Sequence, residues 1–204
     1  QDSRNWPFDN GDCERYLPHI AFYLEPDSQI PSREMLKKTR LVELSDDNSV
    51  NKRIQELKDI NPDMVISVRI ALDRDGVERA IELANENVEV IHVRADQNGD
   101  EVDAKKPRFI KDMIREIHTT LVESGKRDEI TLIAGGGIAL PEHMAKAIIC
   151  GADLVSIDLP LLIGLECHLC DRCSPGLPCP ARIEEVDFEN GVGRMANLIA
   201  AWHG

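Results

Sequence analysis

Hydrophobic residues along this chain follow two periods, one typical of buried strands and one typical of amphipathic helices. The run MVISVRI at 64–70 is nearly continuous and rich in β-branched residues, as in a strand buried on both faces. Three similar runs follow, VEVIHV at 88–93, EITLIA at 129–134 and ADLVSI at 152–157. These four runs predict four buried strands.

The segments between these runs carry apolar residues three or four positions apart, which predicts helices that bury one face. Asn48 or Ser49 is suited to begin the first helix, and Asn61-Pro62 ends it. A later helix opens with Pro141 near its first position and closes at Gly151. The predicted helices cover about 48–60, 75–86, 109–124 and 141–150, with a final one that carries Val192, Met195, Ile199 and Trp202.

The pattern divides the chain into four segments. Residues 1–47 are expected to be an irregular N-terminal extension, since they contain several prolines, although the apolar runs HIAFYL and RLVEL allow for further strands. The others are a βα-repeat half-barrel at 48–163, a cysteine-rich loop at 164–183 and a C-terminal helix at 184–204.

Alternating strands and helices predict the α/β class, with a parallel sheet built from βαβ crossovers. A complete eight-fold (β/α) barrel takes about 250 residues, so the four clear βα units are expected to be the C-terminal half of one. Half a barrel leaves two unpaired sheet edges. We therefore expect another subunit, a second copy or further sequence to complete the barrel.

Composition narrows the possible partners and location. The formal net charge is −13 and aromatic residues make up 4% of the chain, which argues against binding to nucleic acid or to anionic membrane surfaces. No apolar run is long enough to span a bilayer, and the N-terminus lacks the pattern of a signal peptide. We expect a cytoplasmic protein without membrane insertion.

Four of the six cysteines, Cys167, Cys170, Cys173 and Cys179, fall within thirteen residues, spaced C-x2-C-x2-C-x5-C-P. Closely spaced thiols on one loop suit a [4Fe–4S] cube, in which each iron takes one thiolate. A zinc site is the main alternative, but zinc motifs separate two ligand pairs by a dozen or more residues. Disulfides are disfavoured in a reducing compartment.

Two other features have a purely structural interpretation as well as a functional one. Gly135, Gly136 and Gly137 lie between a strand and a helix, where bare N–H groups bind anions, but they also suit a tight turn that needs positive φ. His92 lies on a strand and either lines a pocket or is a core histidine. Asp96, Asp100 and Asp103 are expected to form a solvated loop. No nucleophile–base pair is evident, so no catalytic residue is assigned.

From about residue 60 to 183 the chain resembles the FMN-binding barrel domain of glutamate synthase and its archaeal-type relatives. The resemblance rests on NPDMVISVRI, on IHTTLVESGKRDEITLIAGGGI, on KAIICGADLVSIDLPLLIGLEC and on the cysteine loop with its CP ending.

The resemblance implies cofactors and their ligands. Family members hold a three-iron cluster on three cysteines, whose places are taken here by Cys167, Cys173 and Cys179. Cys170 is additional and supplies the missing corner of a four-iron cube, with a [3Fe–4S] cluster as the fallback. In the family, the glycines that match Gly135–Gly137 bind the phosphate of FMN. The resemblance also implies that Arg69, which replaces a lysine of the family, faces the flavin or the substrate. A glycine–threonine pair beside the phosphate is replaced here by Asp158 and Leu159, and a glycine-rich loop by DQNGD at 96–100.

The resemblance therefore implies an oxidoreductase subunit of glutamate synthase type. In the first hypothesis, electrons pass between a cluster and flavin for imine–amine chemistry, with 2-oxoglutarate or a related amino acid as substrate. In the second, the chain is an electron-transfer or scaffold subunit that keeps the cluster and has lost FMN. In both, its partner is another redox subunit or a second copy.

Overall fold

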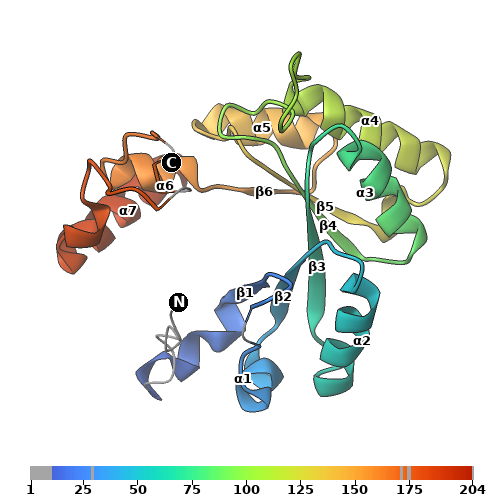
Figure 1. Ribbon diagram of the computed structural model, residues 1–204, viewed down its shortest axis with the longest axis horizontal. Helices are drawn as coiled ribbons and strands as arrows, with labels where there is room; N and C mark the ends of the chain where they lie inside the picture. The colour runs from blue at the N-terminus through green and yellow to red at the C-terminus, as the bar shows by residue number, and fades with distance from the viewer. Residues whose placement is uncertain (1–10, 29, 171, 174–175, 204) are drawn as a thin grey trace.

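The computed structural model describes residues 11–28, 30–170, 172–173 and 176–203. Strands and helices alternate through most of the chain (Figure 1). The strands are β1 (Ala21–Leu24), β2 (Leu41–Ser45), β3 (Val65–Ala71), β4 (Val90–Arg94), β5 (Thr131–Gly135) and β6 (Leu154–Ser156). The α-helices are α1 (Arg33–Lys38), α2 (Val50–Ile60), α3 (Gly76–Asn85), α4 (Ile110–Glu123), α5 (Pro141–Cys150), α6 (Leu159–Gly164) and α7 (Phe188–His203). Three 3₁₀ segments are η1 (Gly11–His19), η2 (Arg127–Glu129) and η3 (Ile183–Glu185).

The six strands form one parallel sheet in sequential order, β1-β2-β3-β4-β5-β6. In Figure 1 they form an open fan with helices α2 to α5 around its outer side. A complete barrel of this kind has eight strands. The arrangement confirms the predicted α/β half-barrel of parallel strands.

The first two strands come from the segment for which we expected irregular structure, so the sheet has six strands where the pattern showed four clear units. Strands β1 and β2 are short, and only every second residue is buried, as with Phe22, Leu24, Val42 and Leu44. A strand of four or five residues that buries one face leaves a weaker hydrophobic pattern in the sequence than the continuous apolar run of β3. The two early apolar runs do form strands.

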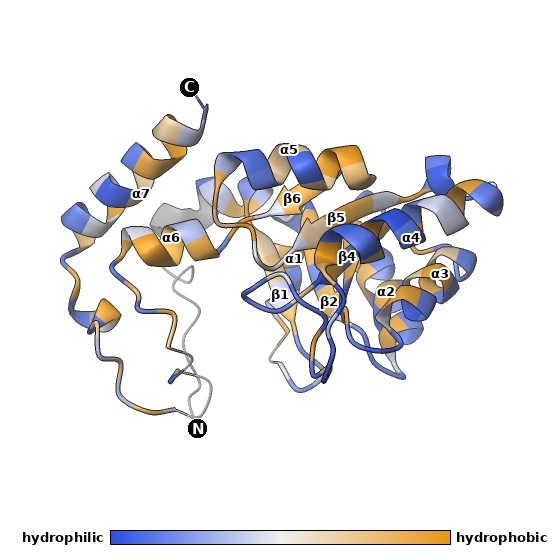
Figure 2. Ribbon diagram, turned by 90° about the horizontal axis from the view of Figure 1, so that it is seen from above, coloured by the Kyte–Doolittle hydropathy of each residue, from blue (hydrophilic) through white to orange (hydrophobic). Residues whose placement is uncertain are grey.

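The hydrophobic core lies between the outer face of the sheet and the helices that cover it. Successive side chains on a strand point to opposite faces, so Val42 and Leu44 enter this core while Glu43 faces the concave side. Figure 2 shows α4 and α5 alternating between hydrophobic and hydrophilic colours, as helices with one buried side do. The same alternation leaves polar groups on the concave face.

Local chemistry sets the ends of several helices. The Ser32 hydroxyl accepts a hydrogen bond from Met35 N–H at the start of α1. Pro141 opens α5, and Gly151, with φ of 119°, ends it. Ser49 precedes α2 as expected, but its side chain bonds Asp47 instead of the helix backbone.

Beyond β6 the chain leaves the fan (Figure 1). Helix α6 follows β6 directly, the cysteine loop comes next, and α7 returns to pack against α6. An ion pair of 2.8 Å joins Arg194 of α7 to Glu166, just after α6. The cysteine loop is thus held at both ends by a helix pair beside the last strand. Within the described part of the chain, no helix combines the length and apolar character needed to cross a membrane.

Candidate functional site

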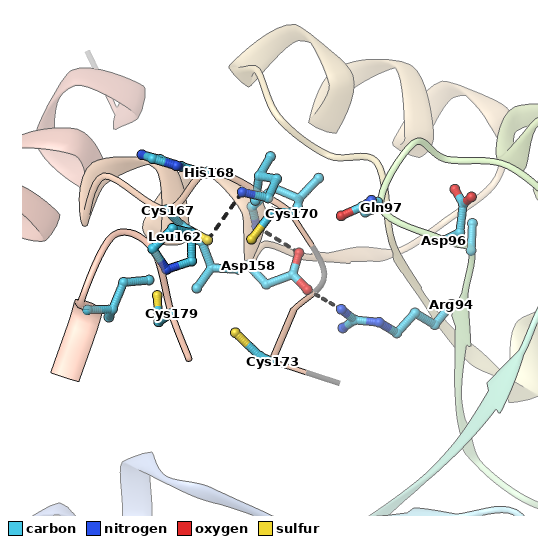
Figure 3. Close-up of a pocket in the computed structure, with 15 residues that line it drawn as sticks. Arg94, Asp96, Gln97, Asp158, Leu162, Cys167, His168, Cys170, Cys173 and Cys179 are labelled. Carbon is cyan, nitrogen blue, oxygen red and sulfur yellow. Dashed lines mark hydrogen bonds and ion pairs between the residues drawn. The ribbon is translucent and has the colours of Figure 1, made fainter. Parts of the chain in front are cut away.

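The four loop cysteines share one cavity with residues from the carboxyl end of β4 and the start of α6. The cavity has a volume of about 560 Å³. Figure 3 shows the cysteine side chains around it, with Asp158 between the loop and Arg94. Its lining is Arg94, Ala95, Asp96, Gln97, Asp158, Leu159, Leu162, Cys167, His168, Leu169, Cys170, Cys173, Cys179, Pro180 and Ile183. In parallel barrels the functional groups gather at this end of the strands.

The cysteine loop turns sharply beside α6. Glu166 and Leu169 have left-handed backbones, with φ of 65° and 49°. The second turn brings Leu169 N–H to 3.4 Å from Cys167 Sγ, to which it donates a hydrogen bond. Cys167 and Cys179 are half-buried, whereas Cys170 and Cys173 are exposed. A backbone donor to sulfur is one of the contacts by which proteins tune bound iron–sulfur clusters.

The donor set suits a soft metal centre. Thiolates select iron–sulfur clusters, zinc or copper(I) over harder ions. Across the described residues, which omit 171, 174 and 175 of the loop, no group of three or more His, Cys, Asp or Glu side chains is gathered tightly enough to hold a metal ion. The four thiols share a cavity, and their chemistry fits an iron–sulfur group.

Arg94 and Asp158 connect the half-barrel to the segment that carries the cysteines. One Asp158 oxygen accepts a hydrogen bond of 2.8 Å from Leu159 N–H at the start of α6, and the other pairs with the Arg94 guanidinium (Figure 3). Both side chains are about 30% exposed. The two residues are 64 positions apart in sequence, and their side chains line one side of the cysteine cavity.

Gly135 ends β5, and the two glycines that follow it lie against the loop after β4. Gly136 has a φ of 91°, and a Cβ added there would be 2.3 Å from the carbonyl oxygen of Ala95. A Cβ on Gly137, whose φ is 68°, would lie 2.4 Å from Gly99 Cα. A Cβ on Gly135 would be 2.9 Å from His92 Nε2. Close packing accounts for all three glycines without a bound anion.

Two features of this region are electrostatically unfavourable to the flavin phosphate that the resemblance implies here. The carboxylate of Asp158 already accepts the Leu159 N–H, and carbonyl oxygens of Ala95 and Asp96 lie against Gly136. A carboxylate or a carbonyl oxygen close to a phosphate is electrostatically unfavourable. Arg69 lies apart from these glycines on β3 and lines a different cavity, of about 310 Å³, with Tyr23, Ser45 and Arg94.

A polar cluster occupies the concave face of β2, β3 and β4. His92 Nδ1 is 2.6 Å from Glu43, which also accepts from the Ser67 hydroxyl at 3.4 Å and from Arg69 at 3.5 Å. The Arg69 guanidinium stacks on the Tyr23 ring, 4.5 Å from its centroid. His92 is 4% exposed, and its Nε2 has no hydrogen-bond partner within the described residues. His92 is therefore a buried histidine that Glu43 orients.

The cluster holds the pKa of Glu43 below its ordinary value of 4.5. Burial opposes ionisation, but the hydrogen bond and charge of His92 and the charge of Arg69 outweigh it. Since the folded pKa is depressed, this stabilisation is present above the unfolded pKa of about 4.5 and is lost as pH falls through the folded pKa.

Glu43→Gln is expected to lower the free energy of unfolding by about 1–3 kcal/mol at pH 7, because a charged partner of His92 and Arg69 is lost. The deficit should shrink as pH falls below about 4.5. Urea unfolding at pH 7 and at a pH below about 4.5 measures the loss of unfolding free energy. Glu56→Gln, on the exposed face of α2, is the control. A deficit that grows on acidification would contradict this account.

Several predicted residues serve the loops. Asp96 Oδ1 accepts from the backbone N–H groups of Asn98 and Asp100, each at 2.8 Å, so it organises the loop after β4. His168 is exposed and lines the cysteine cavity. The role of Glu43 and the pairing of Arg94 with Asp158 were not predicted. The signals in the sequence were a charged residue within the run RLVEL and one directly after each of the runs VEVIHV and ADLVSI.

The sequence matches a family model, described as a conserved region in glutamate synthase, over residues 29–201. The archaeal glutamate synthase [NADPH] of Methanocaldococcus jannaschii is 40% identical over 96 residues, which are 44% of this chain and 19% of that protein. That of Archaeoglobus fulgidus is 25% identical over 158 residues, 70% of this chain and 30% of that protein. The aligned part thus spans about a fifth to a third of these relatives.

Solved structures share the fold at low sequence identity. A FabK mutant from Thermotoga maritima has a TM-score of 0.51 at 18% identity, covering 70% of this chain and 43% of that one. A flavocytochrome b2 mutant with benzoylformate has a TM-score of 0.57 at 16% identity, covering 89% and 47%. Because the family model covers most of the sequence, this chain belongs to the family defined by the conserved region in glutamate synthase.

Proposed function

We propose that this chain is an electron-transfer unit of a glutamate synthase-type oxidoreductase and that Cys167, Cys170, Cys173 and Cys179 hold a [4Fe–4S] cluster. The observation that carries the proposal is that all four thiols line one cavity at the carboxyl end of the parallel sheet. The relatives that match are named glutamate synthase [NADPH], which is a redox activity.

Iron–sulfur chemistry suits this loop better than zinc does. Structural zinc sites join two ligand pairs that are well separated in sequence, whereas here the thiols come from thirteen consecutive residues. A cubane needs one thiolate for each of its four irons, and the loop supplies four. When bound, such a cluster stores and passes one electron at a time.

The residues around the thiols have distinct tasks. Leu169 N–H donates a hydrogen bond to Cys167 Sγ, which orients that sulfur. Leu159, Leu162 and Ile183 give the cavity an apolar side that limits water. Pro180 follows Cys179 and restricts the backbone where the chain leaves the loop.

The proposal assigns electron transfer to this chain without FMN, because the carboxylate of Asp158 stands where the family carries a glycine–threonine pair beside the flavin phosphate. It also assigns the remaining barrel strands to another redox subunit, a second copy or further sequence of the same protein. Among the described residues, no strand pairs with the outer edges of β1 and β6, and Leu154 on the β6 edge is 53% exposed. Unpaired edges of this kind favour pairing with another chain.

The test of this function is the absorption spectrum of the anaerobically purified chain. A broad charge-transfer shoulder without flavin bands is the expected result. Flavin bands beside the shoulder would restore the flavin-dependent hypothesis and overturn the assignment without FMN. Zinc without iron in elemental analysis would reject electron transfer altogether.

Cys170→Ala is expected to convert the four-iron cluster to a three-iron one. It removes the fourth thiolate, which this chain has in addition to the three cysteines at the family positions. Electron paramagnetic resonance of the oxidised protein should show a three-iron signal that the unmodified chain lacks. Cys150→Ala, at the end of α5 and outside the cavity, is the matched control. A spectrum unchanged by Cys170→Ala would show that Cys170 is not a ligand.

A further inference from the structure

We infer that the charges of Arg94 and Asp158 set the reduction potential of the cluster proposed above. Arg94 raises this potential and Asp158 lowers it. The inference rests on the proposed function. It starts from the two side chains that pair across the cysteine cavity, one from β4 and one from the start of α6.

The placement of the pair gives it direct electrostatic access to the thiols. Arg94 and Asp158 line the same cavity as all four cysteines, and each side chain is about 30% exposed. Asp96 lines it too, but its carboxylate is used by two backbone N–H groups of its own loop. Charges in a partly enclosed cavity are screened less than charges on an open surface.

The sign of each effect follows from the charge that reduction adds. An iron–sulfur cluster gains one negative charge when it is reduced, so a nearby guanidinium favours the reduced form and a nearby carboxylate opposes it. In the intact chain the two charges offset one another. Removal of either therefore leaves the other uncompensated beside the cluster.

The test is a redox titration of the cluster, monitored by electron paramagnetic resonance, in variants that keep the shape of the pair. Arg94→Gln should lower the midpoint potential, because Asp158 is left unpaired. Asp158→Asn should raise it, and asparagine can still cap α6. The double variant should return close to the original potential, and Arg94→Lys, which keeps the charge, should stay there as well.

Matched controls make the same charge changes away from the cavity. Arg115→Gln and Asp112→Asn lie on the exposed side of α4 and outside the cavity lining, so they should leave the potential unchanged. If Arg94→Gln lost its cluster, Asp158→Asn would still test the inference, because a potential that fell or stayed unchanged in that variant would contradict it.

The outcomes separate this inference from the proposed function. Shifts of the same sign in Arg94→Gln and Asp158→Asn would mean that the pair acts only by holding the loop, and unchanged potentials would mean that it does not reach the cluster. Either result overturns the inference and leaves the cluster in place. An unmodified chain that assembles no cluster would overturn both.

Discussion

Cys167→Ala combined with Cys173→Ala is expected to remove the iron–sulfur cluster entirely. Two of the four thiols remain in this double variant, and two thiolates cannot satisfy the irons of a four-iron or a three-iron cluster. Iron and acid-labile sulfide per chain should fall to about a tenth of the original or less, and the charge-transfer absorption should disappear. The α/β half-barrel should keep its far-ultraviolet circular dichroism, because the loop lies outside the hydrophobic core.

The control for this variant is Cys150→Ala, since Cys150 packs against the core and is not part of the cavity. It should retain iron and sulfide at the original level. Full retention of the cluster in the double variant would show that the metal is bound elsewhere. The cysteine loop would then not be the cluster site that we propose.

Gly136→Ala is expected to lower the free energy of unfolding by about 3 kcal/mol or more. The added Cβ would lie 2.3 Å from the Ala95 carbonyl oxygen, and the residue would keep a left-handed backbone with φ of 91°. The contact is with backbone, so relief requires the loop after β4 to move. Urea-induced unfolding of the chain measures the loss.

Gly125→Ala separates strain from packing. Gly125 also has a left-handed backbone, with φ of 69°, but nothing lies within 4 Å of an added Cβ. It should cost only about 1 kcal/mol. Equal losses at Gly125 and Gly136 would contradict the view that close packing against the β4 loop explains the glycine at 136.

The sequence was informative about the fold wherever strands are buried on both faces. The runs that became β3 and β4 are continuous and apolar, because helices cover one face and neighbouring side chains cover the other. The run of β6 is apolar as well, although this strand lies at the sheet edge, where Leu154 is 53% exposed. Strands β1 and β2 bury one face over four or five residues, and prolines flank them. In the sheet β2 pairs with β3 and β1 pairs with β2, and the local pattern cannot reveal either pairing.

The candidate site was predictable only where its residues are close in sequence. The spacing of the cysteines already placed four thiols on one loop, and the structure brings them to one cavity. The Arg94–Asp158 and Glu43–His92 pairs join residues 64 and 49 positions apart, so they depend on the strand register. Likewise, the residues that pack against Gly136 come from another loop. The sequence around the glycines therefore could not distinguish a tight turn from an anion site.

The most direct test of the account is the iron and acid-labile sulfide content of the anaerobically purified chain, measured together with its electron paramagnetic resonance after reduction. The account predicts about four irons and about four sulfides per chain, with one signal typical of a reduced four-iron cluster. A single bound zinc ion, or cysteines paired in disulfides without iron, would contradict it.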